Sequence, residues 1–242
     1  MKHQYVGDLN DYRKYALLRA LSANGQNRIG VCWMLTPDDN SSDGNKLAYL
    51  EQPDKHRPFE PELFDILSAA SAVPDWRRLE TVEASGVIPG ASYFNAELSD
   101  HVPARHNFMD TCASTLADSD LIFFDPDNGL EIALSKGRKG SSKYLYLDEA
   151  ERFFAMGKSL LIYQHFPRIE HGAFTAASAA RLRSATPGAA IWAFTTSNVV
   201  FLLAVHPRGP ARLAIAAMEA SKKWNAPFIT GRYLPAEAII DG

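Results

Sequence analysis

Carboxylates that directly follow an apolar run are the feature of this sequence with the clearest chemical meaning. In segment 121–131 (LIFFDPDNGLE), two carboxylates, an amide and a glycine follow four apolar residues. Charges at the end of a buried strand are costly to desolvate, so packing alone explains them poorly. A simple turn is the alternative, because Asp-Pro and Asn-Gly both favour turns. We favour a catalytic role for Asp125, Pro126 and Asp127, and substrate contact for Asn128.

A second group of polar residues opens the first predicted helix. Asp8, Asp11 and Lys14 follow one another at three-residue spacing, with Tyr12 among them. On a helix this spacing places the charged side chains along one side. Carboxylates are also favoured at a helix N-terminus by the helix dipole, so an ordinary solvated helix end is the alternative. The functional interpretation assigns all four residues to substrate binding.

A basic segment follows the acidic one. Residues 136–144 (KGRKGSSKY) hold four cations and two glycines. Cationic side chains and exposed backbone N–H groups can hold phosphates, and Arg138, Lys139 and Lys143 are the candidates. The segment lacks the spacing of a P-loop, and a solvated basic loop is the alternative.

His165 comes directly after a predicted strand, where it could bind substrate or transfer a proton. A single histidine more often only makes a hydrogen bond. The other histidines show no metal-ligand spacing such as H-x-x-x-H, and Cys32 and Cys112 are too few for a disulfide framework or a four-cysteine zinc site. Both cysteines lie in apolar contexts, which predicts reduced thiols in the core.

The elements that must position these residues alternate between short apolar runs and longer helical patterns. Strands are predicted at 29–35, 79–83, 92–95, 121–125, 159–164, 189–195 and 199–205. Helices are predicted at about 8–24, 61–70, 104–117, 148–157, 170–184 and 213–224. The polar segment 36–60 is expected to be a long loop or lid.

This alternation predicts one α/β domain over residues 1–242, a doubly wound and mostly parallel sheet covered on both faces. Only residues 196–198 separate the last two strands, too few for a parallel crossover, so these strands should form a C-terminal antiparallel hairpin. In open α/β sheets, ligands bind beyond the carboxyl ends of the strands. The polar residues after 35, 124 and 164 should therefore meet at one site.

Composition limits the classes of partner. The formal charge of −3 and the pI near 6.2 argue against a protein that coats nucleic acid generically. No apolar run reaches the roughly 18 residues of a membrane span, and the first residues lack the apolar stretch of a signal peptide. We expect a cytoplasmic protein without membrane association, and no sequence feature marks an oligomer interface.

The motifs 7–15 (GDLNDYRKY) and 125–129 (DPDNG) resemble an uncharacterised bacterial protein family. More distantly, the order of features is similar to that of adenine-N6 ribosomal RNA methyltransferases. Those enzymes have a class I fold, an N-terminal helix with an Asp-x-x-Lys-like motif, and an Asp-Pro-Pro-Tyr motif after the fourth strand. The resemblance implies that Asp125 and Pro126 hold the amino group of an RNA or DNA base that has left the duplex or is single-stranded.

The resemblance also implies S-adenosylmethionine as cofactor. Its expected contacts are the polar residues after the first strand, Thr36, Asp38 and Asp39. The sequence departs from the methyltransferase pattern at two places. Residues 37–44 (PDDNSSDG) replace the glycine-rich turn that admits the cofactor, and Asp127 and Asn128 replace the second proline and the aromatic ring that stacks on the base.

The sequence is also consistent with two further functions. Asp125, Asp127 and Glu131 supply the oxygen ligands that Mg²⁺ prefers, and the basic segment could neutralise a phosphate, which would make a phosphoesterase or nuclease. A non-catalytic module that binds nucleotides or RNA is the other alternative.

Overall fold

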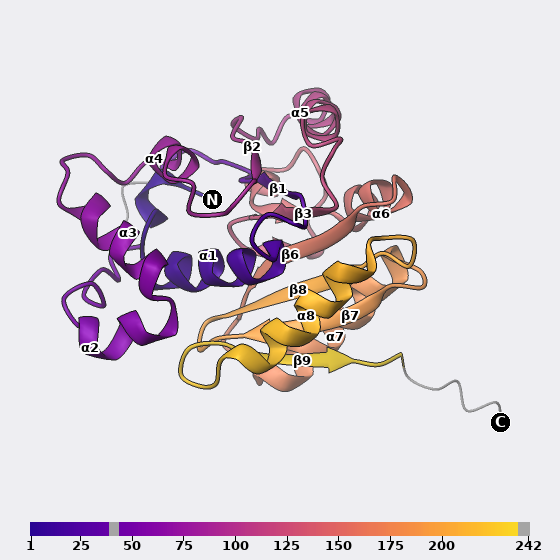
Figure 1. Cartoon of the computed structure of the whole chain (residues 1–242). Helices are drawn as coiled ribbons and strands as arrows, with labels where there is room; N and C mark the ends of the chain where they lie inside the picture. The colour runs from indigo at the N-terminus through magenta and orange to yellow at the C-terminus, as the bar shows by residue number, and fades with distance from the viewer. Residues whose placement is uncertain (39–43, 237–242) are drawn as a thin grey trace.

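A seven-stranded sheet forms the centre of the computed structural model, which describes residues 1–38 and 44–236 (Figure 1). The strand order is β2-β1-β3-β6-β8-β7-β9. The strands are β1 (Ile29–Cys32), β2 (Ser92–Phe94), β3 (Leu121–Phe124), β6 (Ser159–His165), β7 (Ala190–Thr195), β8 (Val199–Val205) and β9 (Thr230–Leu234). From β2 to β6 all pairings are parallel, whereas β8 pairs antiparallel with β6 and β7, and β9 antiparallel with β7. Five of the seven strands therefore run in one direction.

Helices cover both faces of this sheet. They are α1 (Leu9–Ser22), α2 (Pro53–His56), α3 (Pro61–Ser71), α4 (Leu79–Ala84), α5 (Val102–Thr115), α6 (Leu147–Ala155), α7 (His171–Ala185) and α8 (Ala211–Lys223). Three short 3₁₀ helices are η1 (His3–Tyr5), η2 (Arg57–Phe59) and η3 (Ser141–Lys143). A separate two-stranded sheet joins β4 (Gly129–Leu130) to β5 (Tyr144–Leu145).

The hydrophobic core has two layers because neighbouring strand residues point to opposite faces of the sheet. Phe123 belongs to the cluster formed with α1, α3 and α8, whereas Phe124 belongs to the cluster formed with α5, α6 and α7. All four residues of β3 are fully buried, as expected for a strand covered on both faces. The arrangement is Rossmann-like and confirms the doubly wound α/β prediction, including the antiparallel hairpin of β7 and β8.

Three local predictions were wrong or incomplete. The strand predicted at 79–83 is helix α4, in which Leu79 and Val82, three residues apart, are the buried positions. The predicted loop 36–60 contains α2 and η2 near its end. Strand β9 had no prediction, because it lies at the edge of the sheet and alternates poorly between buried and exposed residues. No helix in the described ranges is both long and apolar enough to cross a bilayer.

Candidate functional site

A cavity of about 300 Å³ lies where β3 and β6 end, beside the first turn of α1. Its position agrees with the general rule for ligand sites in open α/β sheets. The lining combines charged, amide and aromatic side chains from several elements, namely Met1, Tyr5, Asp8, Asn10, Asp11, Lys14, Gly44, Lys46, Asp125, Pro126, Asp127, Asn128, Tyr163 and His165. The predicted acidic turn and the predicted helix start therefore meet in one place.

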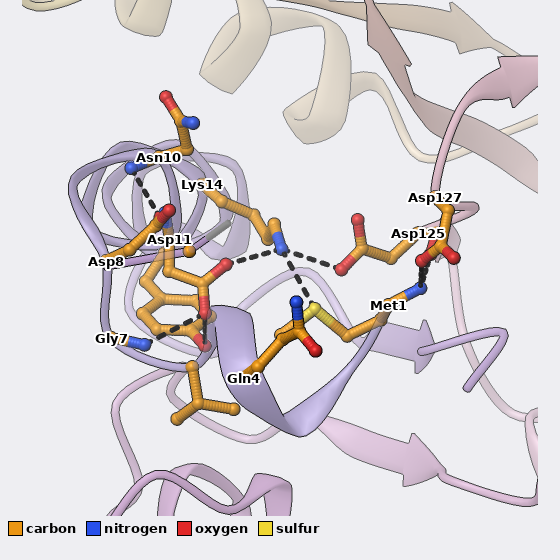
Figure 2. Close-up of polar contacts among 12 residues, drawn as sticks. Met1, Gln4, Gly7, Asp8, Asn10, Asp11, Lys14, Asp125 and Asp127 are labelled. Atoms are coloured by element: carbon orange, nitrogen blue, oxygen red, sulfur yellow. Dashed lines mark hydrogen bonds and ion pairs between the residues drawn. The ribbon is translucent and has the colours of Figure 1, made fainter. Parts of the chain in front are cut away.

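Lys14 forms the centre of the site (Figure 2). Its Nζ donates hydrogen bonds to Asp11 Oδ1 at 2.6 Å and to Asp125 Oδ2 at 2.7 Å, and only 3% of the lysine is exposed. Burial alone would lower the pKa of Lys14, but the two carboxylates outweigh burial and raise this pKa. Lys14 is therefore a permanent cation between two carboxylates.

The second oxygen of Asp11 is also occupied. Asp11 Oδ2 accepts hydrogen bonds from the Tyr15 hydroxyl at 2.6 Å and from the backbone N–H of Gly7 at 3.1 Å. Tyr15 is fully buried, and burial followed by the charge of Asp11 raises the pKa of its hydroxyl. Asp11 is thus held from three directions and orients Lys14 towards Asp125.

Asp8 caps the N-terminus of α1. Its Oδ1 accepts hydrogen bonds from the backbone N–H groups of Asn10 at 2.8 Å and Asp11 at 2.9 Å. Asp8 is only 4% exposed, and burial together with the nearby charge of Asp11 raises its pKa to about 7. The site therefore contains a carboxyl group that titrates near neutral pH.

Among the described residues, side-chain contacts to Asp125 involve only one of its carboxylate oxygens. Oδ2 contacts Lys14, while the other oxygen points away from the lysine in Figure 2, and no donor among the described residues reaches it. Burial raises the pKa of Asp125, and Lys14 opposes this shift. Because Asp125 and Pro126 both line the cavity, the unused oxygen can accept a hydrogen bond from a ligand.

Asp127 faces different partners. Its Oδ1 lies 2.7 Å from the amino group of Met1, and its Oδ2 accepts a hydrogen bond from Thr36 Oγ1 at 2.8 Å. Burial would raise the pKa of Asp127, but the amino group and the hydroxyl outweigh it, so the pKa is lowered. Asp127 is therefore an ionised carboxylate that ties the residues after β1 to the acidic turn.

The basic segment is attached to the acidic turn through its backbone. Asn128 N donates to the carbonyl of Lys143 at 3.0 Å, and β4 pairs with β5 directly afterwards. Arg138 and Lys139 are exposed, and neither lines the cavity. Asp100 holds the segment on the other side by accepting from Gly140 N at 2.8 Å. Of the three predicted phosphate contacts, only Lys143 is linked to the acidic turn.

Eight of the predicted site residues line the cavity, namely Asp8, Asp11, Lys14, Asp125, Pro126, Asp127, Asn128 and His165. Tyr12 does not, because its side chain is fully buried, stacks on Tyr49 with ring centroids 5.2 Å apart, and donates to the carbonyl of His56 at 2.9 Å. The prediction did not include Tyr5, Asn10, Lys46 and Tyr163. Asn10 lies inside the helix motif and Tyr163 lies near a predicted strand end, so the sequence contained a signal for these two residues. No local feature of the sequence indicates Lys46.

The predicted metal ligands do not converge. Asp125 faces Lys14 and Asp127 faces Met1, while Glu131 lies 3.9 Å from Arg181, whose guanidinium also donates to the Glu131 carbonyl. Within residues 1–38 and 44–236 there is no group of three His, Cys, Asp or Glu side chains that could hold a metal ion.

Two of the three residues predicted to bind S-adenosylmethionine have hydrogen-bond partners within the chain. Thr36 donates its hydroxyl to Asp127, and Asp38 Oδ1 accepts a long hydrogen bond from Gln4 N at 3.4 Å. Neither residue lines the cavity, and Asp39 lies outside the described residues. Comparison with known protein families, curated proteins and solved structures finds no match to this chain. The fold and the site therefore define a Rossmann-like α/β protein with a polar, acid-rich cavity at its sheet edge.

Proposed function

We propose that this chain is a class I methyltransferase-like protein that binds an unpaired base of RNA or DNA, with the exocyclic amino group of the base against Asp125 and Pro126. The supporting observation is the 2.7 Å contact between Lys14 and Asp125, which are 111 residues apart. This contact joins the two motifs on which the methyltransferase resemblance rests.

The proposed chemistry follows from the unused oxygen of Asp125. An amino group of adenine or cytosine is a hydrogen-bond donor, and a carboxylate held by a cation is a strong acceptor. A base enters such a cavity only after it has left the duplex or from a single strand. In this proposal Asn128 and His165, which line the cavity, contact the base, and Arg138 and Lys139, which are exposed outside the cavity, contact backbone phosphates.

We propose binding of the base and no methyl transfer. The methyl donor implied by the resemblance would need a pocket after β1, where Thr36 and Asp38 are engaged within the chain. The separate partners of Asp125, Asp127 and Glu131 favour base binding over magnesium-dependent phosphoryl chemistry, which requires shared ligands.

Binding of labelled oligouridylates that carry one central adenosine or one central inosine tests this proposal by fluorescence anisotropy. Adenosine offers an amino donor where inosine offers a carbonyl acceptor, so the wild-type protein should prefer adenosine. In Asp125→Asn, Lys14 should take the amide oxygen and turn the NH₂ group into the cavity, which should invert the preference. A hydrogen bond to a charged group contributes about 1.5–3 kcal/mol, so the wild-type preference should be roughly tenfold to a hundredfold. The hydrogen bond in Asp125→Asn joins two neutral groups and contributes about 0.5–1.5 kcal/mol, so the inverted preference should be roughly twofold to tenfold.

Asp127→Asn is the matched control. The substitution also removes one negative charge from the acidic turn. In the wild-type protein the Asp127 carboxylate contacts Thr36 and Met1, so we expect no contact between Asp127 and the base. Equal binding of both oligonucleotides by the wild-type protein, or an unchanged preference in Asp125→Asn, would refute the assignment of Asp125. Absence of oligonucleotide binding would refute the proposed function as a whole.

A further inference from the structure

Gln164 lies at the end of β6, beneath the acidic turn, and has no role in the site described so far. It is 6% exposed, and its carboxamide makes three hydrogen bonds to backbone groups. Oε1 accepts from Leu130 N at 2.8 Å, while Nε2 donates to the carbonyls of Asn128 at 2.9 Å and His165 at 3.0 Å. One side chain therefore bonds to both ends of residues 128–130 and to the strand that carries the histidine.

Gly129 shows how closely the turn passes over this carboxamide. Its φ of +120° is a backbone conformation that residues with a Cβ adopt only under strain. A Cβ at this position would also lie 2.3–2.5 Å from the carboxamide atoms of Gln164. The glycine of the DPDNG motif is therefore explained by Gln164 and by the turn conformation together.

The residues held by this carboxamide belong to the cavity wall. Asn128 and His165 both line the cavity, and His165 N donates to the carbonyl of Asn128 at 3.2 Å. Asn128 N donates in turn to Lys143, which connects the same turn to the basic segment. Movement of residues 128–130 relative to β6 would displace Asn128 from His165.

We propose that Gln164 is the positioning residue of this site, which holds the acidic turn against β6 so that Asn128 and His165 face the ligand together. Its effect on ligand binding rests on the proposed function. Its effect on the turn does not, because the hydrogen bonds of Gln164 form within the chain. The two effects can therefore be measured separately.

Amide hydrogen exchange tests the effect on the turn. Gln164→Leu keeps much of the side-chain volume and removes all three hydrogen bonds. We expect exchange at the amides of Asn128, Leu130 and His165 to accelerate at least tenfold more than exchange at Phe123 in the core of the sheet. Ser159→Ala is the control, since Ser159 Oγ accepts a buried hydrogen bond from His206 N at 3.0 Å at the opposite end of β6. This control should leave the turn amides unchanged relative to Phe123.

A double-mutant cycle with Gly129→Ala adds a second measurement. In the wild-type background the new Cβ meets the carboxamide, so Gly129→Ala should accelerate exchange of the turn amides. In a Gln164→Ala background the collision is absent, and the same substitution should have a smaller effect. Additive effects, or acceleration spread evenly over the sheet, would refute the positioning role.

Binding of the adenosine-containing oligouridylate completes the test. Gln164→Leu should weaken binding at least tenfold, whereas Ser159→Ala should not. If the wild-type protein binds and Gln164→Leu binds equally well, Gln164 does not position the ligand site. If the wild-type protein does not bind, the proposed function fails, and the exchange data alone decide whether Gln164 holds the turn.

Discussion

Replacement of Asp8 by Asn should stabilise the protein at alkaline pH. Asp8 is 4% exposed and lies beside the carboxyl group of Asp11, so its own ionisation in the folded state is unfavourable. Asn carries no charge at any pH and is also a good N-cap residue, so the two backbone hydrogen bonds at the start of α1 should persist. The substitution thus removes the cost of ionisation and retains the cap.

The magnitude follows from the pKa of Asp8, which is raised from its ordinary value of 3.8 to about 7. Between these two pH values the unfolded chain has lost the proton while the folded chain retains it. The free energy of unfolding therefore falls as pH rises from about 4 to about 7 and levels off above. At about 1.4 kcal/mol for each pH unit, the full contribution is at most about 4 kcal/mol.

Urea unfolding at pH 4.5 and pH 8 measures this contribution. Asp8→Asn should be more stable than the wild-type protein by about 1 kcal/mol at pH 4.5 and by up to about 4 kcal/mol at pH 8. Asp127→Asn should instead be less stable than wild type at both pH values, because the lowered pKa of Asp127 gives a stabilising contribution that is present throughout this range and that the variant loses. A difference between wild type and Asp8→Asn that does not change with pH would refute the reasoning.

Three other predictions concern Lys14 in the site and the residues Tyr12, Arg138 and Lys139 outside it. Lys14→Met should lower the free energy of unfolding by about 3–5 kcal/mol in urea titrations, because two buried carboxylates lose their cation; a loss below 1 kcal/mol would contradict this. Tyr12→Phe should leave oligonucleotide binding unchanged in anisotropy titrations, since its hydroxyl is bonded inside the core. Arg138→Ala with Lys139→Ala should reduce the salt dependence of single-strand binding by ~0.7 per lost phosphate contact, and an unchanged slope would remove both residues from the phosphate path.

Titration of the protein with S-adenosylhomocysteine addresses the cofactor separately. Because Thr36 and Asp38 are engaged within the chain, we expect no saturable heat of binding. One-to-one binding would contradict this expectation, and methyl transfer would then become part of the proposed function.

The sheet could be predicted from the sequence because its inner strands are short apolar runs separated by helical patterns. The acidic turn could be predicted because carboxylates directly after a buried strand are a local signal. The direction in which the Tyr12 side chain points could not be predicted. Helix α1 is buried at every position from Asp11 to Leu18, so it has no exposed face over that stretch. The absence of Arg138 from the cavity lining could not be predicted either, because the basic segment is held by Asp100, which lies 38 residues before Arg138 and gives no local signal.

The position of β8 inside the sheet has a consequence for how the cavity forms during folding. All lining residues of the cavity lie in the first 165 residues, yet β6, which ends there, pairs on its outer side with Val199–Val205. During synthesis the parallel half of the sheet emerges first, with an unpaired and largely apolar edge. A truncated chain that ends after His165 would contain all of the lining residues and would still leave that edge open. We therefore expect formation of the cavity to require docking of the β7–β8 hairpin, which contributes none of the lining residues.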